Sequence, residues 1–160
     1  MRIKIVPFII LLLFLSFCTK NEPDKLDNLE IDNIDYFAFG NAHGMCQGDC
    51  TNFFIIINGK IYPDDMDYYL GTSLKFKSDA LPVGKYDLAK KLIDSFPTYL
   101  VDNPNKTFGC PDCIDQGGIH IEIKEKGLIK RWHFDTTISS LPSEIQDYVQ
   151  EIAVVLEQLK

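Results

Sequence analysis

Alternation of hydrophobic and polar residues in the C-terminal half of the chain predicts a β-hairpin. Hydrophobic residues occupy every second position over residues 119–124, and a second alternating segment follows over residues 128–135. A loop centred between them pairs residues whose numbers sum to 253, which places Trp132 opposite Ile121 on the buried face. A register shifted by one residue would turn the aromatic side chains outward, so the buried face fixes the pairing.

Three further strands are predicted nearer the N-terminus. A short aromatic strand covers residues 36–40, and an apolar strand rich in Phe and Ile covers residues 52–57. Asn58-Gly59 then favours a two-residue turn, because both central positions of that turn need a positive φ. Residues 60–62 would return antiparallel to the preceding strand.

Two helices are predicted from a change to helical spacing. Apolar residues recur every four positions between residues 87 and 100, and Pro97 predicts that this helix ends, kinks or restarts there. A last helix begins near Pro142, where residues 143–146 have the form of a capping box. Its apolar residues form a continuous stripe: Ile145, Val149, Ile152, Leu156 and Leu159.

The order of these elements, β-β-β-α-β-β-α, predicts an α+β fold. Antiparallel hairpins with helices packed on one face give an antiparallel sheet covered by two helices, which is a two-layer sandwich. Residues 34–160 form one domain of this kind, because 160 residues leave room for one domain rather than two. A domain of this size buries roughly two-thirds of its unfolded surface, which is enough for a hydrophobic core.

The N-terminal residues have the pattern of an export signal. A basic start with Arg2 and Lys4 precedes an almost unbroken apolar run over residues 5–17. As a helix this run would rise roughly 20 Å, which is well short of the roughly 30 Å core of a bilayer. We therefore assign residues 1–17 to a signal peptide. A buried core helix is the alternative, but a core helix carries polar residues at regular intervals and this run does not.

The end of the apolar run, Leu15-Ser16-Phe17-Cys18, resembles the lipobox of bacterial lipoproteins. The sequence matches that family at Leu15 and Cys18 and departs from it at Phe17, where the family prefers Gly, Ala or Ser. The resemblance implies that Cys18 becomes the lipid-bearing N-terminus and that the mature chain is anchored in the bacterial cell envelope, in the outer membrane. Its acyl chains exceed the two signals that stable anchoring needs, so the membrane is the expected partner of the N-terminus.

Residues 18–33 are predicted to form an acidic tether. Five acidic residues lie in it: Glu22, Asp24, Asp27, Glu30 and Asp32. So few aliphatic residues accompany them that the segment cannot bury enough surface to become ordered, and the like charges would extend it. An acidic stretch after a lipidated Cys also resembles the export tags of outer-surface lipoproteins, while a plain solvated linker explains it equally well.

The charge balance argues against nucleic acid as a partner. The chain has 16 Lys and Arg against 23 Asp and Glu, which gives a net charge of −7. Removal of the signal peptide would also remove Arg2 and Lys4, so the mature protein would be still more acidic. Neutralising phosphates requires a surplus of basic residues, which this chain lacks.

The five cysteines divide into the predicted lipidation site at Cys18 and four others, Cys46, Cys50, Cys110 and Cys113. An even number of cysteines in an exported chain predicts two disulfides. Either each close pair forms a local bridge, or crossed bridges link the loop before residue 52 to the loop before residue 119. The sequence leaves this connectivity open.

Two other functions are compatible with these cysteines. Cys110-Pro111-Asp112-Cys113 has the C-x-x-C form of a thiol–disulfide redox protein, but no predicted helix follows it, and nearby acidic residues would raise the pKa of a thiol. The four cysteines could instead hold a zinc ion as thiolate ligands, with His43 as a substitute ligand. In an oxidising compartment disulfides compete with zinc, so we expect no cofactor and keep zinc as the alternative.

The hairpin register also places His120 opposite His133 on the outer face of the predicted sheet. Neutral imidazoles paired in this way can ligate a metal ion. Two exposed cross-strand side chains without a role explain the pair more simply. We therefore keep these histidines as weak metal candidates.

Two loop segments mark where we expect a functional site. Residues 40–50 and 110–118 are rich in Gly and Cys, and together they are similar to small single-domain lipoproteins of the bacterial envelope, a resemblance that implies no known activity. If these loops meet in space, they form one Cys-rich patch at an end of the sheet. No serine-hydrolase, metalloprotease, phosphate-loop or dinucleotide motif occurs. The sequence therefore predicts a non-enzymatic binding or structural domain with an unidentified protein or small-molecule partner.

Overall fold

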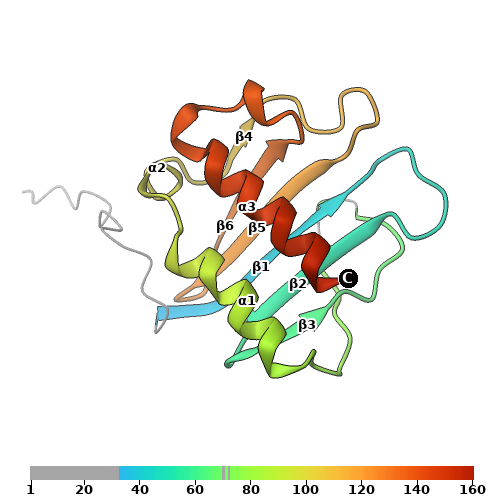
Figure 1. Ribbon diagram of the computed structural model, residues 1–160, viewed down its shortest axis with the longest axis vertical. Helices are drawn as coiled ribbons and strands as arrows, with labels where there is room; N and C mark the ends of the chain where they lie inside the picture. Colours follow the sequence, from blue (N-terminus) through green and yellow to red (C-terminus); the bar gives the residue numbers. More distant parts are fainter. Residues whose placement is uncertain (1–32, 70, 72) are drawn as a thin grey trace, which may run out of the picture.

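The computed structural model describes residues 33–69, 71 and 73–160, which form an α+β fold (Figure 1). The strands are β1 (Ile34–Ala42), β2 (Thr51–Ile57), β3 (Lys60–Pro63), β4 (Lys106–Phe108), β5 (Gly118–Glu125) and β6 (Leu128–Asp135), and the helices are α1 (Val83–Asp94), α2 (Thr98–Val101) and α3 (Ser143–Leu159). The sheet has the order β3-β2-β1-β5-β6-β4. The predicted signal peptide, the lipidation site Cys18 and all of the predicted tether except Asn33 lie outside the described residues.

The two predicted hairpins both form. β5 and β6 pair antiparallel with Ile121 opposite Trp132, which confirms the predicted register. In the turn between β2 and β3, Asn58 has a φ of 50° and Gly59 a φ of 71°, as the Asn-Gly pair predicts. Alternation and turn chemistry are local properties, so both hairpins are specified by the residues that form them.

The sheet is mostly antiparallel, as predicted, but it is mixed rather than wholly antiparallel, and the predicted element order lacks α2 and β4. β4 pairs in parallel with β6 at the sheet edge, and the short helix α2 precedes it. β4 spans 3 residues, which is too short for an alternating pattern to reveal. Trp132 holds this segment beside β6, because its Nε1 donates hydrogen bonds to the carbonyls of Leu100 at 3.1 Å and Asn103 at 2.8 Å.

Prolines mark the starts of two helices. The chain resumes as α2 directly after Pro97, which confirms the prediction that helical structure ends or restarts at that residue. α3 begins after Pro142, whose ring pre-sets the backbone for a helix. The predicted capping box does not form, since no side chain caps this helix and the Ser143 hydroxyl bonds to Glu144 instead.

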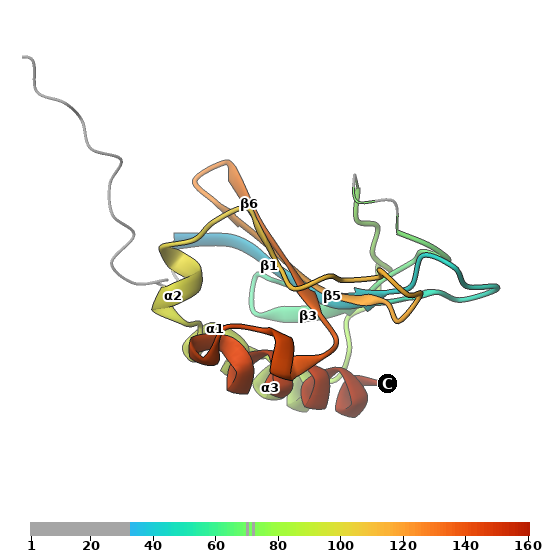
Figure 2. The same ribbon diagram turned by 90° about the horizontal axis from the view of Figure 1, so that it is seen from above.

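α1 and α3 lie side by side on one face of the sheet, and Figure 2 shows this face edge-on. Tyr148 of α3 joins them by donating a hydrogen bond to the carbonyl of Leu92 at 2.8 Å. The core between helices and sheet includes these fully buried side chains: Trp132, Phe37, Phe39, Phe134, Ile121 and Val149. Within the described part of the chain, no helix is both long and apolar enough to cross a membrane.

Candidate functional site

The face of the sheet opposite the helices carries a histidine pair. His120 on β5 and His133 on β6 are cross-strand partners, and their ring centroids are 4.5 Å apart. The register that buries Trp132 on one face also brings these two rings together on the other. Both side chains are partly buried, so the expectation of two freely exposed histidines is wrong.

His120 is enclosed by aromatic rings. Its ring centroid lies 5.7 Å from that of Phe53 and 5.2 Å from that of Tyr69, which the long loop after β3 carries onto this face. Gly40 makes room for Phe53, since a Cβ at position 40 would lie only 2.6 Å from Phe53 Cα. The Nδ1 atom of His120 is buried and has no hydrogen-bond partner among the described residues.

Burial keeps the rings at this site uncharged. It lowers the pKa of His120 to about 3, and repulsion by His133 acts in the same direction. Burial also lowers the pKa of His133, with the positive charge of Arg131 as the second cause. The pKa of Tyr69 is raised, first by burial and then by the carboxylate of Glu122. At neutral pH the site therefore presents neutral imidazoles and a neutral phenol.

The two cysteine-containing loops meet beside this histidine pair. The loop between β1 and β2 brings Gly44 so close to Asp112, in the loop between β4 and β5, that a Cβ on Gly44 would overlap the Asp112 carboxylate. A Cβ on Gly117 would lie 2.5 Å from Nδ1 of His43, and Gly117 has a φ of +76°. Only glycine fits such close approach. The loops thus come together at one end of the sheet, which meets the condition that the sequence left open.

Each of these loops is closed by a local disulfide. Cys46 pairs with Cys50 and Cys110 with Cys113, at Cα–Cα distances of 5.7 and 5.6 Å. Of the connectivities that the sequence left open, the structure therefore has the local one. In the described part of the chain, no group of three or more His, Cys, Asp or Glu side chains is arranged to hold a metal ion.

Asp135, at the end of β6, ties the second loop to the sheet. Its Oδ2 accepts a hydrogen bond from the backbone N–H of Cys110 at 2.9 Å, and its Oδ1 accepts one from Thr137 at 2.8 Å. The bonds from Thr137 and Cys110 hold the pKa of Asp135 below its ordinary value. This carboxylate therefore fixes the start of the loop that carries Pro111 and Asp112.

A cavity of about 200 Å³ lies between these loops and the histidine pair. We name it the histidine pocket, and the residues that line it are Ala42, His43, Gly44, Tyr69, Gly71, Pro111, Asp112, His120 and His133. It thus brings together all three histidines that the sequence singled out, while the cysteines are not among its lining residues. Tyr69 had no sequence signal, because the loop that carries it shows no periodic pattern.

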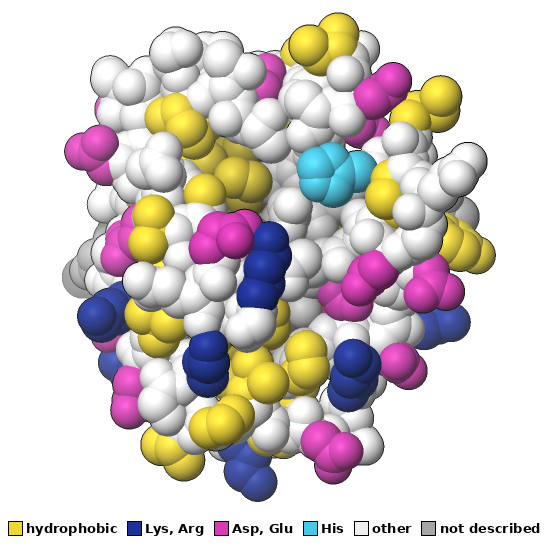
Figure 3. Space-filling view, turned by 45° about the vertical axis from the view of Figure 1, so that its right-hand side comes forward, with side chains coloured by type: hydrophobic (Ala, Val, Ile, Leu, Met, Phe, Trp, Pro, Cys, Tyr) yellow, Lys and Arg dark blue, Asp and Glu magenta, His cyan; other side chains and the backbone are white. Residues whose placement is uncertain are grey.

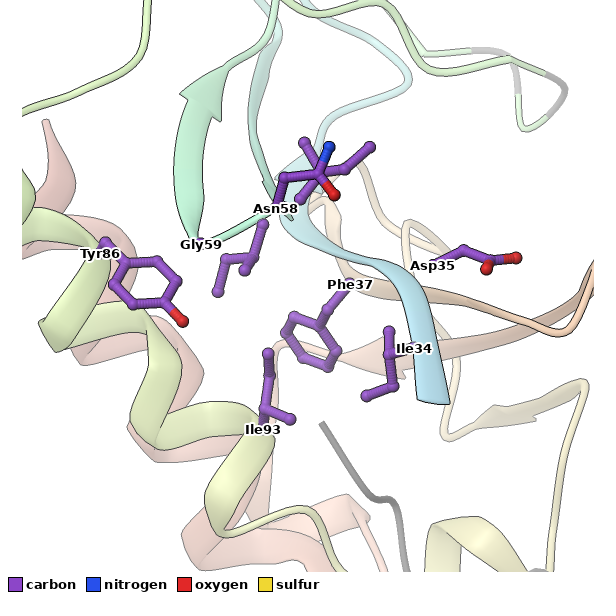
Figure 4. Close-up of a pocket in the computed structure, with 9 residues that line it drawn as sticks. Ile34, Asp35, Phe37, Asn58, Gly59, Tyr86 and Ile93 are labelled. Atoms are coloured by element: carbon purple, nitrogen blue, oxygen red, sulfur yellow. The ribbon is translucent and has the colours of Figure 1, made fainter. Parts of the chain in front are cut away.

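A second cavity, of about 210 Å³, lies at the opposite end of β1 (Figure 4). Figure 4 shows Ile34, Phe37 and Ile93 gathered together there, with Asp35 directed away from them. The Asp35 carboxylate already accepts a hydrogen bond from the N–H of Gly127 at 3.1 Å. None of the buried, unpartnered polar atoms of the described residues lies in this cavity, so it offers few specific contacts to a ligand.

A third cavity, of about 310 Å³, shares His43 with the histidine pocket and is lined by polar residues that include Asp49 and Asn52. The Nδ2 atom of Asn52 is buried and lacks a partner among the described residues. On the face shown in Figure 3, one histidine lies beside a hollow, with acidic and basic side chains interspersed around it. Both unpartnered buried groups of the described chain, on Asn52 and His120, therefore line cavities at the loop end of the sheet.

No known protein family matches the chain, and no curated protein is significantly similar to it.

Proposed function

We propose that this protein is a lipid-anchored domain of the bacterial cell envelope that binds a small ligand in the histidine pocket. The observation that supports binding is the convergence of His43, His120 and His133 on one cavity. A cavity with a few convergent polar groups is the usual form of a ligand site.

Several contacts hold the walls of the histidine pocket in place. A disulfide closes each loop, and Asp135 ties the second loop to the end of β6. Asp112 secures its own turn, since its Oδ1 accepts a hydrogen bond from the N–H of Gly117 at 3.1 Å. A cavity formed before the ligand arrives loses less conformational entropy on binding. The groups in it supply hydrogen bonds and ring contacts, which suits binding rather than covalent catalysis.

The position of the pocket is consistent with an N-terminal anchor. β1 begins at Ile34, close to where the N-terminal segment joins the domain, and ends at Ala42 beside the histidine pocket. A strand of this length spans roughly 26 Å. An N-terminal tether would therefore join the domain at the opposite end of β1 from the pocket.

The anchor is tested by fractionating bacteria that produce the full chain or its Cys18→Ser variant. We expect the full chain to sediment with membranes, to require detergent for extraction, and to have lost residues 1–17 and gained the mass of a lipid. The variant should lack the lipid mass. Recovery of the untagged full chain in the soluble cytoplasmic fraction would overturn the anchor.

Ligand binding is tested by NMR on the detergent-solubilised mature protein with ¹⁵N-labelled histidine. We expect a library of uncharged, cationic and anionic fragments to contain compounds that shift the ring signals of His120 and His133, and Tyr69→Ala should weaken these shifts. Tyr68→Ala is the matched control, because Tyr68 is 66% exposed and does not line the pocket. A library in which no fragment shifts the two ring signals would overturn the proposal.

The redox and zinc alternatives concern the four cysteines. Cys110 and Cys113 are exposed, so a reducing partner could reach their disulfide. Zinc binding by four thiolates would first require reduction of both disulfides. An insulin-reducing activity that disappears in the Cys113→Ser variant would move the redox alternative to first place.

A further inference from the structure

The two ring nitrogens of His120 have different surroundings. Nδ1 is buried and has no partner among the described residues. Nε2 lies on the Pro111 side of the ring, since a Cβ placed on Gly118 would be 3.4 Å from Nε2 and 2.7 Å from Pro111 Cβ. Because His120 and Pro111 both line the histidine pocket, Nε2 is the nitrogen that a ligand there would meet.

The enclosure of Nδ1 also decides where the ring proton sits. A neutral imidazole carries one N–H donor and one bare acceptor nitrogen. A buried N–H without an acceptor is rare and costly, while an unused acceptor is tolerated more often. The proton therefore belongs on Nε2, and the pKa of about 3 is consistent with this, because the imidazolium would need an acceptor for Nδ1–H as well.

The charges around the pocket disfavour ionic ligands. No Lys or Arg is among the lining residues, and the carboxylate that lines the pocket is that of Asp112. An anion would be repelled by Asp112 and would find no cationic partner. A cation would be attracted by Asp112, but an ammonium group carries donors only and would leave the Nε2–H donor of His120 without an acceptor. An uncharged ligand avoids both conflicts.

The size and walls of the pocket limit the ligand further. A volume of about 200 Å³ corresponds to roughly six or seven waters at about 30 Å³ each. Ring-bearing side chains form much of the wall, namely Tyr69, His133 and Pro111. This space fits a molecule built on a single small ring with a polar substituent.

We propose that the histidine pocket selects an uncharged polar ligand, about the size of one six-membered ring, that accepts a hydrogen bond from Nε2–H of His120. This inference rests on the proposed function and specifies its ligand class. A carbonyl or hydroxyl oxygen of the ligand lies about 2.9 Å from Nε2. The carboxylate of Asp112 accepts a hydrogen bond from a donor on the same ligand.

Three probes that each carry one six-membered ring separate the ligand classes. They are 2-piperidone, which is uncharged and has a carbonyl, piperidine, which is a cation at neutral pH, and cyclohexanecarboxylate, which is an anion. NMR titrations of the mature protein in detergent give the affinities. We expect 2-piperidone to shift the ring signals of His120 and Tyr69 and to bind at least about tenfold more tightly than either charged probe.

Two variants test the role of His120 in this selection. His120→Phe keeps an aromatic ring and removes the donor, so we expect the affinity for 2-piperidone to fall at least about tenfold. Tyr68→Phe is the matched control, because it removes a polar group from an aromatic ring that is 66% exposed and does not line the pocket, and we expect less than about a threefold change. Long-range ¹H–¹⁵N correlations of the histidine rings report which nitrogen of His120 carries the proton.

The results of these experiments separate the position of the His120 proton, the class of the ligand and ligand binding itself. A proton on Nδ1 of His120 at neutral pH would overturn the inference whatever the ligand. Tighter binding of piperidine or cyclohexanecarboxylate, or equal binding of 2-piperidone to wild type and His120→Phe, would overturn the ligand class and leave ligand binding intact. If neither these probes nor the wider fragment library shift the ring signals, the proposed function fails together with the inference.

Discussion

His120 and His133 face each other across β5 and β6 with their ring centroids 4.5 Å apart, and neither readily accepts a proton. Two positive rings at this distance would repel each other, and burial penalises each charge in addition. The folded protein therefore prefers both imidazoles neutral. This preference links the histidine pair to the stability of the domain.

We expect the protein to lose stability as the pH falls below about 6.5, the ordinary pKa of histidine. In the unfolded chain His120 takes up a proton near that pH, whereas burial and His133 lower its pKa to about 3 in the folded protein. Between these values the unfolded state binds more protons, so acid favours unfolding. The loss is about 1.4 kcal/mol per pH unit for His120, with a further contribution from His133. Urea unfolding at pH 7, 6 and 5 measures it.

The control for this prediction is His120→Phe, which keeps a ring in the same space and removes the titrating group. Its free energy of unfolding should depend less on pH between 6.5 and 5, by about 1.4 kcal/mol per unit. A variant whose unfolding free energy follows the wild-type pH dependence would show that His120 is not excluded from protonation in the folded state.

Gly40 should not tolerate even one methyl group. A Cβ at this position would lie 2.5 Å from Cγ of Phe53 and 2.6 Å from the carbonyl oxygen of Asn52. We expect Gly40→Ala to lower the free energy of unfolding by about 1–3 kcal/mol, because the strands must separate or the Phe53 ring must move. The ring of Phe53 contacts His120, so the NMR signals of that histidine should move as well.

Gly84→Ala is the matched control for Gly40→Ala. Gly84 lies in the first turn of α1, and a Cβ there would meet no atom within 4 Å. The added methyl group reduces the freedom of the unfolded chain, so we expect a gain of about 0.5–1 kcal/mol. Thermal or urea unfolding of the two variants side by side measures both effects. Equal destabilisation by the two would contradict the steric explanation at position 40.

The histidine pair was predictable from the sequence because local features determine it. A short turn and a period-two pattern fix the β5–β6 register, and the register fixes which side chains share a row. Tyr69 was not predictable, because it reaches the pocket through a long loop held by distant contacts such as the bridge between Asp64 and Phe76. Local sequence therefore determines the histidine pair of the pocket, and tertiary contacts determine the position of Tyr69.

The parallel pairing at the edge of the sheet also depends on tertiary contacts. β4 pairs with β6 because Trp132 holds the preceding turn through the carbonyls of Leu100 and Asn103, about thirty residues away in the sequence. No local pattern encodes such a contact. The disulfide connectivity could not be predicted from local patterns either, because it depends on the path of each loop whether the cysteine pairs bridge locally.

The open face of the sheet also contains a buried carboxylate whose loss of partners should be costly. Glu122 accepts a hydrogen bond from the Tyr36 hydroxyl at 2.5 Å and another from Nε of Arg131 at 2.6 Å. Arg131→Ala would leave this carboxylate, whose side chain is 11% exposed, without its positive partner. We expect a loss of about 1–3 kcal/mol in the free energy of unfolding.

The matched control for Arg131→Ala is a variant of a solvent-exposed ion pair. Glu157 and Lys160 form such a pair near the end of α3, with side chains 70% and 53% exposed. Exposed pairs contribute little, so Glu157→Ala should change the free energy of unfolding by less than about 0.5 kcal/mol. Urea unfolding at neutral pH distinguishes the two cases. A smaller loss for Arg131→Ala than for Glu157→Ala would show that Glu122 is solvated once Arg131 is removed.

The two disulfides should stabilise the domain to similar extents but affect the histidine pocket differently. Each closes a loop of a few residues, with sequence separations of 4 and 3, and loops of this size contribute about 2 kcal/mol each. Intact mass under non-reducing conditions should be about 4 Da below that of the reduced chain. Double Cys→Ser variants of each pair should therefore both unfold at lower urea concentration.

The pair at Cys110 and Cys113 encloses Pro111 and Asp112, which line the histidine pocket, whereas none of the three residues between Cys46 and Cys50 does so. Replacing both of these cysteines with serine should consequently weaken fragment binding in the pocket, while the same change at Cys46 and Cys50 should lower stability and leave binding nearer to wild type. Equal effects on binding would mean that the Cys46–Cys50 bridge also holds His43 and Gly44 in place in the pocket wall. Turnover of insulin disulfides by the wild type, lost in Cys113→Ser, would instead assign the second bridge to redox chemistry rather than to holding the pocket wall.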